Sequence, residues 1–143
     1  MFKRTVREKA TISIHASKDT VWQILTDFQR WPVWNSDVID MHYEGPLVVG
    51  TTFTWKGGGL NIVSTVTDIK PNSSITWKGR AFGINAEHTY RLSEHDNTVH
   101  VETEETFTGL LPTLMPRYMQ KVLKKSLASG LEKLKVEAEN IES

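Results

Sequence analysis

Apolar and polar residues alternate at the start of the chain and then change to a helical spacing. The alternation over Thr5–Ala16 predicts a half-buried β-strand. Ser17 follows as a natural helix N-cap, and the apolar residues of 21–28 recur at intervals of three and four, which predicts a short amphipathic helix. Pro32 disfavours a helical conformation in the residue before it, so we expect residues 31–35 to form a turn or a second very short helix.

The middle of the chain returns to a two-residue period that is interrupted by turn residues at hairpin spacing. Connections this short join antiparallel neighbours, because a parallel pair requires a long crossover. The sequence therefore predicts a meander of consecutive antiparallel strands. Its six strands are expected at about 37–44, 50–56, 60–70, 74–81, 84–93 and 98–108.

The last segment has helical periodicity over about 112–139, which predicts a helix about 40 Å long if it is continuous. Pro112 and Pro116 lie in its opening turns, where a missing N–H costs little. One apolar stripe runs along it: Met119, Leu123, Leu127, Gly130, Leu134, Ala138 and Ile141. Gly130 lowers helix stability, and a close approach between helix and sheet would explain its presence.

A second apolar flank widens the hydrophobic arc in the N-terminal half of this helix. It consists of Leu111, Met115, Tyr118 and Val122, continued by Ser126 and Ser129. An arc this wide requires apolar material on both sides, which is either a thicker protein core or a bound ligand.

Composition narrows the classes of function. The 143 residues carry 17 Lys and Arg against 17 Asp and Glu, and this balance gives no support to nucleic-acid binding. The absence of cysteine excludes disulfides and thiolate zinc sites. No apolar run is long enough for a membrane helix, and residues 1–4 do not lead into a signal-peptide core, so we expect a cytoplasmic protein without stable membrane insertion. The length fits a single domain over residues 1–143, and no pattern specifies an oligomeric state.

Local sequence carries a family resemblance in seven segments: residues 14–22, 27–28, 30–35, 50–53, 75–77, 88–92 and 105–111. Together with the order of elements, these segments resemble the START/SRPBCC superfamily and within it the polyketide cyclase/dehydrase-like group. The resemblance implies an α+β helix-grip fold: a curved antiparallel seven-stranded sheet around a long C-terminal helix, with two short helices after the first strand. It also implies a deep cavity between sheet and helix, usually without a fixed cofactor. It does not imply one activity, because the superfamily includes cyclases, lipid carriers, hydroxylase subunits and co-chaperone-like domains.

Strand alternation predicts which side chains face such a cavity. His88 shares the phase of apolar positions in its strand, and Thr103 and Glu105 share that of Val101 and Phe107. A mostly apolar wall with a few polar groups is typical of small-molecule sites. The candidate ligand-binding residues are Trp34, Phe53, Trp55, Trp77, His88, Tyr90, Thr103, Glu105, Met115, Tyr118 and Val122.

Each polar candidate has a structural and a chemical interpretation. Glu105 either reaches solvent or pairs with Arg80 or Arg117, or it is buried with a raised pKa and transfers protons. His88 is either a satisfied core histidine or a hydrogen-bond donor or general base, and Tyr90 either packs or orients a ligand oxygen. His88, Glu105 and Tyr90 are thus the candidate catalytic residues.

The aromatic candidates also remain open between packing and ligand contact. Trp34, beside Trp31, either closes the end of the sheet or touches ligand, and Trp55 and Trp77 either pack inward or form stacking surfaces. The histidines show no metal-ligand spacing, so no metal site is predicted, although His88 and Glu105 on neighbouring strands leave one open.

Three functions follow as hypotheses. The first is a binding or carrier protein for a small hydrophobic molecule that is lipid-like, aromatic or polyketide-like. The second is a cyclase or dehydratase in which His88 and Glu105 handle protons and Tyr90 orients the substrate. The third is a protein-interaction module, which a filled core and a large exposed apolar patch would favour.

Overall fold

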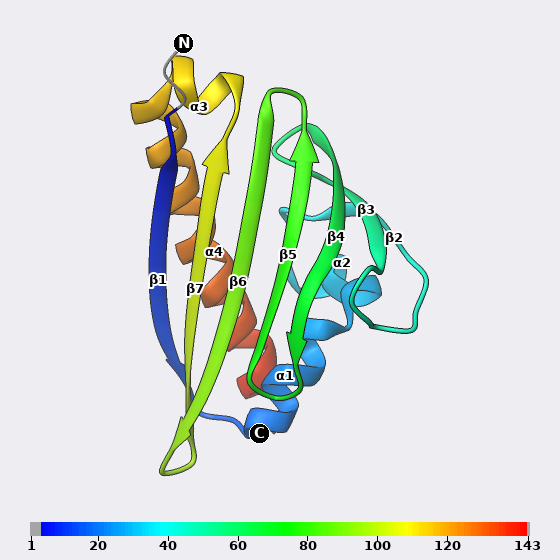
Figure 1. Ribbon diagram of the computed structural model, residues 1–143. Coiled ribbons are helices and arrows are strands. Elements are labelled where there is room, and N and C mark those ends of the chain that lie inside the picture. Colours follow the sequence, from blue (N-terminus) through cyan, green and yellow to red (C-terminus); the bar gives the residue numbers. More distant parts are fainter. Residues whose placement is uncertain (1–3, 143) are drawn as a thin grey trace.

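The computed structural model describes residues 4–142, and one curved sheet with helices on its inner face makes up the fold (Figure 1). The strands are β1 (Val6–Ile14), β2 (Ile39–Tyr43), β3 (Thr52–Gly57), β4 (Leu60–Lys70), β5 (Ser74–Ala81), β6 (Ile84–His95) and β7 (Thr98–Thr108). The helices are α1 (Lys18–Thr26), the 3-10 turn η1 (Phe28–Arg30), α2 (Trp31–Trp34), α3 (Leu110–Leu114) and α4 (Pro116–Glu142). The expectation that residues 1–4 begin no signal peptide falls largely on residues outside the described range.

The strands form a seven-stranded antiparallel sheet in the order β1-β7-β6-β5-β4-β3-β2. From β2 to β7 each strand pairs with the next along the chain, which confirms the predicted meander. β1 completes the sheet by pairing with β7, from Val6 opposite Phe107 to Ile14 opposite Val99. The predicted helix-grip arrangement is confirmed.

The segment after β1 has the predicted cap. The Thr20 backbone N–H donates to the Ser17 hydroxyl at 3.1 Å, and α1 then buries Val21 and Leu25. The chain continues through η1 into α2, with Pro32 in its first turn. Of the two alternatives for this segment, the second very short helix is the one observed.

The prediction of one helix over 112–139 is wrong at its start, because the helix breaks at Met115. Pro116 disfavours the helical conformation in the residue before it, and Met115 has φ −131° and ψ 57°. α4 restarts at Pro116, where the missing N–H is not needed, and its 27 residues extend about 40 Å. Although α4 is long, neither it nor any other helix within residues 4–142 is apolar enough to cross a bilayer.

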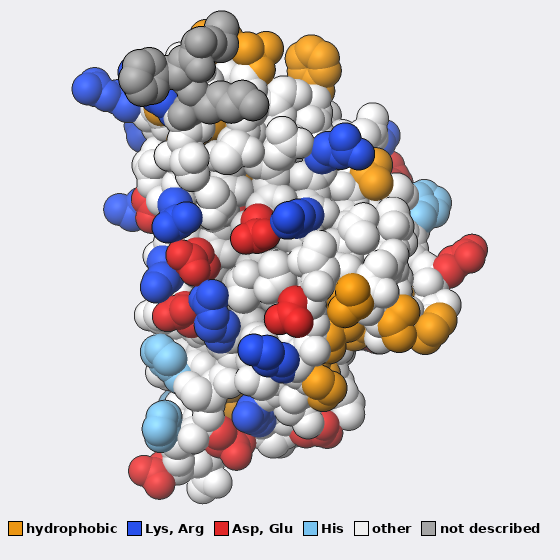
Figure 2. Space-filling model, in the orientation of Figure 1, with side chains coloured by type: hydrophobic (Ala, Val, Ile, Leu, Met, Phe, Trp, Pro, Cys, Tyr) orange, Lys and Arg blue, Asp and Glu red, His pale blue; other side chains and the backbone are white. Residues whose placement is uncertain are grey.

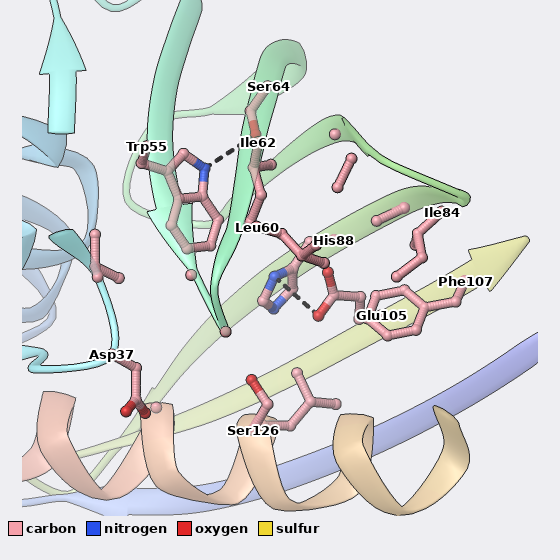
Figure 3. Close-up of a pocket in the computed structure, with 18 of the residues that line it drawn as sticks. Asp37, Trp55, Leu60, Ile62, Ser64, Ile84, His88, Glu105, Phe107 and Ser126 are labelled. Carbon is pink, nitrogen blue, oxygen red and sulfur yellow. Dashed lines mark hydrogen bonds and ion pairs between the residues drawn. The ribbon is translucent and has the colours of Figure 1, made fainter. Parts of the chain in front are cut away.

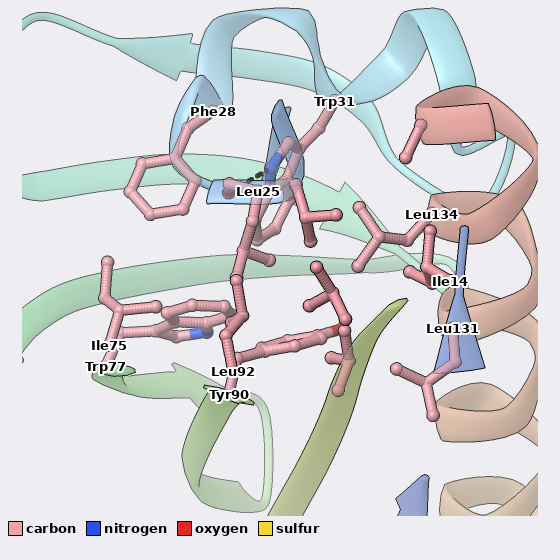
Figure 4. Close-up of a cluster of buried hydrophobic side chains, with 14 of the residues drawn as sticks. Ile14, Leu25, Phe28, Trp31, Ile75, Trp77, Tyr90, Leu92, Leu131 and Leu134 are labelled. Atoms are coloured by element: carbon pink, nitrogen blue, oxygen red, sulfur yellow. Dashed lines mark hydrogen bonds between the residues drawn. The ribbon is translucent and has the colours of Figure 1, made fainter. Parts of the chain in front are cut away.

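The C-terminal half of α4 packs over the main hydrophobic core. Figure 4 shows Leu131 and Leu134 pointing from the helix toward the side chains of the sheet and α1. The buried side chains that surround them come from β1, α1, η1 and the central strands: Ile14, Val21, Leu25, Phe28, Ile75, Trp77, Leu92, Val99 and Val101. This end of the sheet is filled by protein.

The N-terminal half of α4 lies over the edge of the sheet. Its buried residues Met119, Leu123 and Leu127 form a separate cluster with Val6 of β1. In Figure 1 the helix accordingly runs diagonally, from behind β1 and β7 at its start toward α1 at its end. The inner face of the central strands is therefore left uncovered beside this half of the helix.

This packing predicts unequal costs for two substitutions in α4. Leu134→Ala should lower the free energy of unfolding by about 2–5 kcal/mol, because Leu134 is fully buried and its removal leaves a void. Val136→Ala, two residues away and 53% exposed, should change it by less than about 0.5 kcal/mol. Urea unfolding of both variants measures the difference, and equal costs would contradict the described orientation of α4.

Candidate functional site

A cavity of about 410 Å³ lies between the inner face of the sheet and the N-terminal half of α4 (Figure 3). β3–β7, α2, α3 and α4 all contribute to its mainly apolar wall. In Figure 3, His88 and Glu105 project from the sheet into the space opposite Ser126 of α4, while Trp55 stands at the far side. The cavity thus lies beside the N-terminal half of α4, where the sequence has its wide apolar arc.

Small side chains on both faces create this space. Under the C-terminal half of α4, the inner face of the sheet carries Leu92, Val99 and Val101. At the cavity, several inner positions instead carry side chains too short to reach the helix. The small residues of the wall are Ser64, Gly79, Ala81 and Ala86 on the sheet and Ser126 and Gly130 on α4. The cavity therefore arises from the choice of side chains as well as from the diagonal course of α4.

Gly130 faces the cavity at its lower end. A Cβ at this position would lie 3.6 Å from the Tyr90 hydroxyl oxygen, which is an ordinary van der Waals distance. The helix does not approach the sheet closely enough to require glycine here, so the expected explanation for Gly130 is wrong and alanine would be tolerated. Glycine leaves the space above Tyr90 open.

A chain of polar groups crosses β6 and β7 at the cavity wall. His88 lies directly opposite Glu105 in the ladder, and Tyr90 lies opposite Thr103. The Thr103 hydroxyl donates to the Thr89 carbonyl at 3.3 Å, so it accepts a hydrogen bond from His88 Nε2 at 2.7 Å. This fixes the proton on Nε2 and turns the lone pair of Nδ1 toward Glu105.

Burial keeps His88 and Glu105 uncharged. It lowers the pKa of His88 to about 3 and raises the pKa of Glu105 to about 8, because the charged forms lose their hydration. Glu105 Oε1 lies 3.5 Å from His88 Nδ1, a distance that would also suit an ion pair. The pKa shifts instead favour a neutral acid facing a neutral imidazole, with a contact loose enough to leave both groups to a ligand.

The solvent-exposed interpretation of Glu105 is wrong. Its side chain is only 15% exposed, and His88 takes the place that Arg80 or Arg117 was expected to fill. Neither arginine forms an ion pair with any residue in the range 4–142. Within that range no three His, Asp or Glu side chains converge on a point where a metal ion could bind.

Aromatic rings surround this polar pair. The ring centroids of His88 and Tyr90 lie 4.8 Å apart in a stacked arrangement, and those of His88 and Trp77 lie 5.0 Å apart. On the opposite wall Trp55 Nε1 donates to the Ser64 hydroxyl at 3.2 Å. The indole Nε1 of Trp34, also on the wall, is buried without a hydrogen-bond partner among the described residues.

An ion pair ties the border of the cavity to α4. Lys133 Nζ lies 2.9 Å from Asp37 Oδ2 and 3.2 Å from the Ser36 hydroxyl. Asp37 belongs to the segment after α2 that borders the cavity, and its carboxylate also accepts a hydrogen bond from the Ser129 hydroxyl of α4 at 3.4 Å. These contacts hold the segment beside the helix.

Most of the predicted ligand-binding residues lie on the cavity wall. They are Trp34, Trp55, Trp77, His88, Tyr90, Glu105, Tyr118 and Val122.

Three predicted residues do not lie on the wall. Phe53 points inward but stacks on Phe28 at 4.4 Å, so it belongs to the core. Thr103 is buried behind His88, and Met115 sits at the helix break, where it is directed to solvent.

The sequence interpretation did not name other wall residues as candidates. On the strands they include Leu60, Ile62, Ser64, Gly79, Ala81, Ile84, Ala86 and Phe107, and Leu111 joins them from α3. Most are small or aliphatic residues at inward positions, and the run of small ones in β5 and β6 is a signal of unfilled space.

The pairing of His88 with Glu105 was also predictable. Asp96 and Asn97 both have positive φ, as in the two-residue turns that set hairpin register. Counting back along both strands from this turn places His88 opposite Glu105.

Comparison with known proteins agrees with this geometry. The profile of the family described as polyketide cyclase / dehydrase and lipid transport matches residues 5–139, which confirms the resemblance noted in the sequence. No curated protein matches the chain.

Several solved structures share the fold. The Zhui aromatase/cyclase from Streptomyces sp. R1128 is 15% identical, with a TM-score of 0.86 over 98% of this chain and 97% of that one. A START superfamily protein from Mycobacterium smegmatis is 16% identical, with a TM-score of 0.81 over 94% and 98%. The di-domain ARO/CYC StfQ from the steffimycin biosynthetic pathway is 16% identical, with a TM-score of 0.79 over 96% and 52%.

The uncharged pair predicts a specific pH dependence of stability. Above pH 4.5 the unfolded Glu105 loses its proton while the folded one keeps it until about pH 8, so its contribution to stability falls as pH rises through this window. Below pH 6.5 the unfolded His88 gains a proton that the folded one does not bind until about pH 3, so stability falls toward acid. The two slopes oppose each other between pH 4.5 and 6.5.

Glu105 should therefore lower the free energy of unfolding of the wild type by about 2 kcal/mol between pH 6.5 and 8, at about 1.4 kcal/mol per pH unit. Glu105→Gln should abolish this decrease. Urea unfolding of the wild type and of this variant at several pH values measures the difference between them. Glu104→Gln, on the outer face of the same strand, is the matched control. An unchanged slope in Glu105→Gln would show that Glu105 is ionised in the folded protein.

Proposed function

The chain belongs to the polyketide cyclase/dehydrase and lipid transport family, and we propose that it holds a small hydrophobic molecule between the sheet and α4. The molecule is lipid-like, aromatic or polyketide-like, and a single helix-grip domain binds it. The observation that carries this proposal is the cavity of about 410 Å³ with a mainly apolar wall. Ligand sites usually exceed about 300 Å³ and combine apolar walls with a few polar groups.

The polar pair supports a ligand that is neutral and carries at least one oxygen. Glu105 presents an O–H donor and His88 an aromatic face and a lone pair, and neither carries charge near neutral pH. A carboxylate or ammonium group on the ligand would be buried without a counter-charge, which costs several kcal/mol. A carbonyl or hydroxyl oxygen can exchange hydrogen bonds with Glu105 at no such cost.

The cavity also supports ligand binding over the interaction-module hypothesis. A filled core would have favoured that hypothesis, whereas the space beside α4 is empty of protein.

A cavity-blocking variant tests the binding proposal. Ser126→Trp places a large ring in the cavity from α4, and it should abolish binding of an apolar fluorescent probe such as 1-anilinonaphthalene-8-sulfonamide. It should also abolish binding of any small molecule that native mass spectrometry finds on the purified wild type. Ala128→Trp adds the same ring on the exposed side of the helix and should leave both unchanged. Equal binding by the wild type and Ser126→Trp would place the ligand elsewhere.

We propose dehydration or cyclisation as a second candidate, because a proton donor and a proton acceptor lie 3.5 Å apart on the cavity wall. In a β-hydroxy carbonyl substrate, His88 Nδ1 would take the proton next to the carbonyl while the C–O bond breaks. The hydroxyl would leave as water with the proton of Glu105, and a C=C bond would form. Proton transfer from His88 to Glu105 would then restore both groups.

An activity assay separates this candidate from binding alone. With an aryl β-hydroxy ketone as probe, wild-type turnover would appear as the absorbance of the conjugated enone. Glu105→Gln and His88→Ala should each lower kcat by about 100-fold or more, while Glu104→Gln should not. Turnover that survives both substitutions would exclude these residues as the proton-transfer groups, and a wild type that binds the probe without turnover would leave the binding function alone.

A further inference from the structure

We propose that the end of the molecule formed by α3, the β5–β6 turn and the start of α4 docks on the surface of an anionic lipid bilayer. Docking would serve to exchange an apolar ligand with the bilayer, and in this respect the proposal rests on the proposed function. Vesicle binding itself can be measured without any ligand.

Exposed apolar side chains gather at this end. Phe82 at the β5–β6 turn is 82% exposed, and Leu110 and Leu114 of α3 are 51% and 62% exposed. Figure 2 shows hydrophobic side chains standing out at the upper end, over α3 and the β5–β6 turn. With the exposed Met115, Tyr118 and Val122 they form what we call the apolar rim: Phe82, Leu110, Leu114, Met115, Tyr118 and Val122.

The apolar rim adjoins the cavity. The Leu111 backbone N–H donates to the Gly83 carbonyl at 2.9 Å, which holds α3 against the β5–β6 turn. Leu111 itself lines the cavity, as do the rim residues Tyr118 and Val122. An apolar molecule that leaves the cavity past Tyr118 and Val122 would therefore meet exposed apolar surface before water.

Unpaired positive charge lies beside the rim. Residues 110–128 contain Arg117, Lys121, Lys124 and Lys125 and no Asp or Glu. All four are exposed, and none forms an ion pair with any residue in the described range.

The spacing places these charges next to the apolar side chains. Lys121 follows Tyr118 by three residues and Lys125 by seven, so both lie on the face of α4 that carries Tyr118 and Val122.

The rest of the surface that the structure describes has no comparable excess. On the outer face of the sheet, Arg91 pairs with Glu102 at 2.9 Å and Lys78 with Glu87 at 3.8 Å. Figure 2 shows basic and acidic side chains interspersed over this face. Residues 129–142, the C-terminal half of α4, contain four Glu against Lys133 and Lys135. In a chain of zero net charge, residues 110–128 thus carry four exposed basic side chains and no acidic one, and this stretch lies at the apolar end.

A bilayer fits this surface better than an acidic protein does. The rim is not flat: Phe82 projects from a turn and Leu114 from the end of a short helix. Single side chains that project from different elements can insert among lipid chains, while lysines beside them contact anionic headgroups. A protein partner would need a matching hollow for each projecting side chain.

Binding to vesicles tests the proposal directly. We expect ligand-free wild-type protein to co-sediment with vesicles of 70% phosphatidylcholine and 30% phosphatidylglycerol. Binding should be much weaker to pure phosphatidylcholine and in 0.5 M salt. Lys121→Ala with Lys125→Ala should lower the partition coefficient about 25-fold, at about fivefold for each lysine, and Leu114→Asp should also lower it. The matched controls, Lys70→Ala with Lys135→Ala and the single variant Val136→Asp, lie away from the rim and should not change it.

Solution binding of the fluorescent probe keeps the two proposals separable. The rim variants should bind the probe as the wild type does, and Ser126→Trp should lose the probe yet bind vesicles. Wild-type protein that binds the probe but not anionic vesicles would overturn the docking proposal alone. So would protein that binds a soluble acidic carrier protein through Lys121 and Lys125 but not vesicles. Loss of vesicle binding in Val136→Asp equal to that in Leu114→Asp would also overturn it.

Discussion

The structure depends on one packing constraint: a single helix cannot cover the inner face of a curved seven-stranded sheet. α4 buries Leu131 and Leu134 against the central strands at one end and Leu123 against the edge strand β1 at the other. The central strands at the second end must then be covered by large side chains of their own, by another element, or by a ligand. Small inner residues such as Gly79 and Ala86 do not cover them, and the cavity follows.

The chemistry of the site follows from the same geometry. His88 and Glu105 project into the cavity from the part of the sheet that α4 does not reach, and the sheet itself separates them from the charged side chains of its outer face. Because both side chains are buried and Glu105 pairs with no Lys or Arg within residues 4–142, Glu105 keeps its proton and His88 remains neutral. The hydroxyl of Thr103 directs the ring so that its lone pair faces the acid. The same two side chains on a covered part of the sheet would be a structural hydrogen bond and nothing more.

The sequence predicted what is governed by local rules. Period-two alternation placed His88 and Glu105 inside, and the turn at Asp96 and Asn97 carries enough information for their pairing. The sequence could not predict that η1 would bring Phe28 onto Phe53, because that contact depends on how elements distant in the chain pack together.

Two further features were beyond the sequence interpretation for the same kind of reason. A β-bulge between Val66 and Asp68 shifts the phase of β4, so that Ile69 packs against the core, and alternation alone does not show such an insertion. The diagonal course of α4 depends on the curvature of the whole sheet.

The pairing of β1 with β7 has a consequence for how the chain acquires its structure. Val6 and Phe107 are neighbours in the sheet although about a hundred positions separate them along the polypeptide. During synthesis from the N-terminus, β1 therefore has no partner strand until nearly all of the meander has left the ribosome, and its cover by α4 comes later still. Contacts this distant make folding slow and concerted, and they expose an alternating strand in the meantime. The element made first is one of the last to be secured.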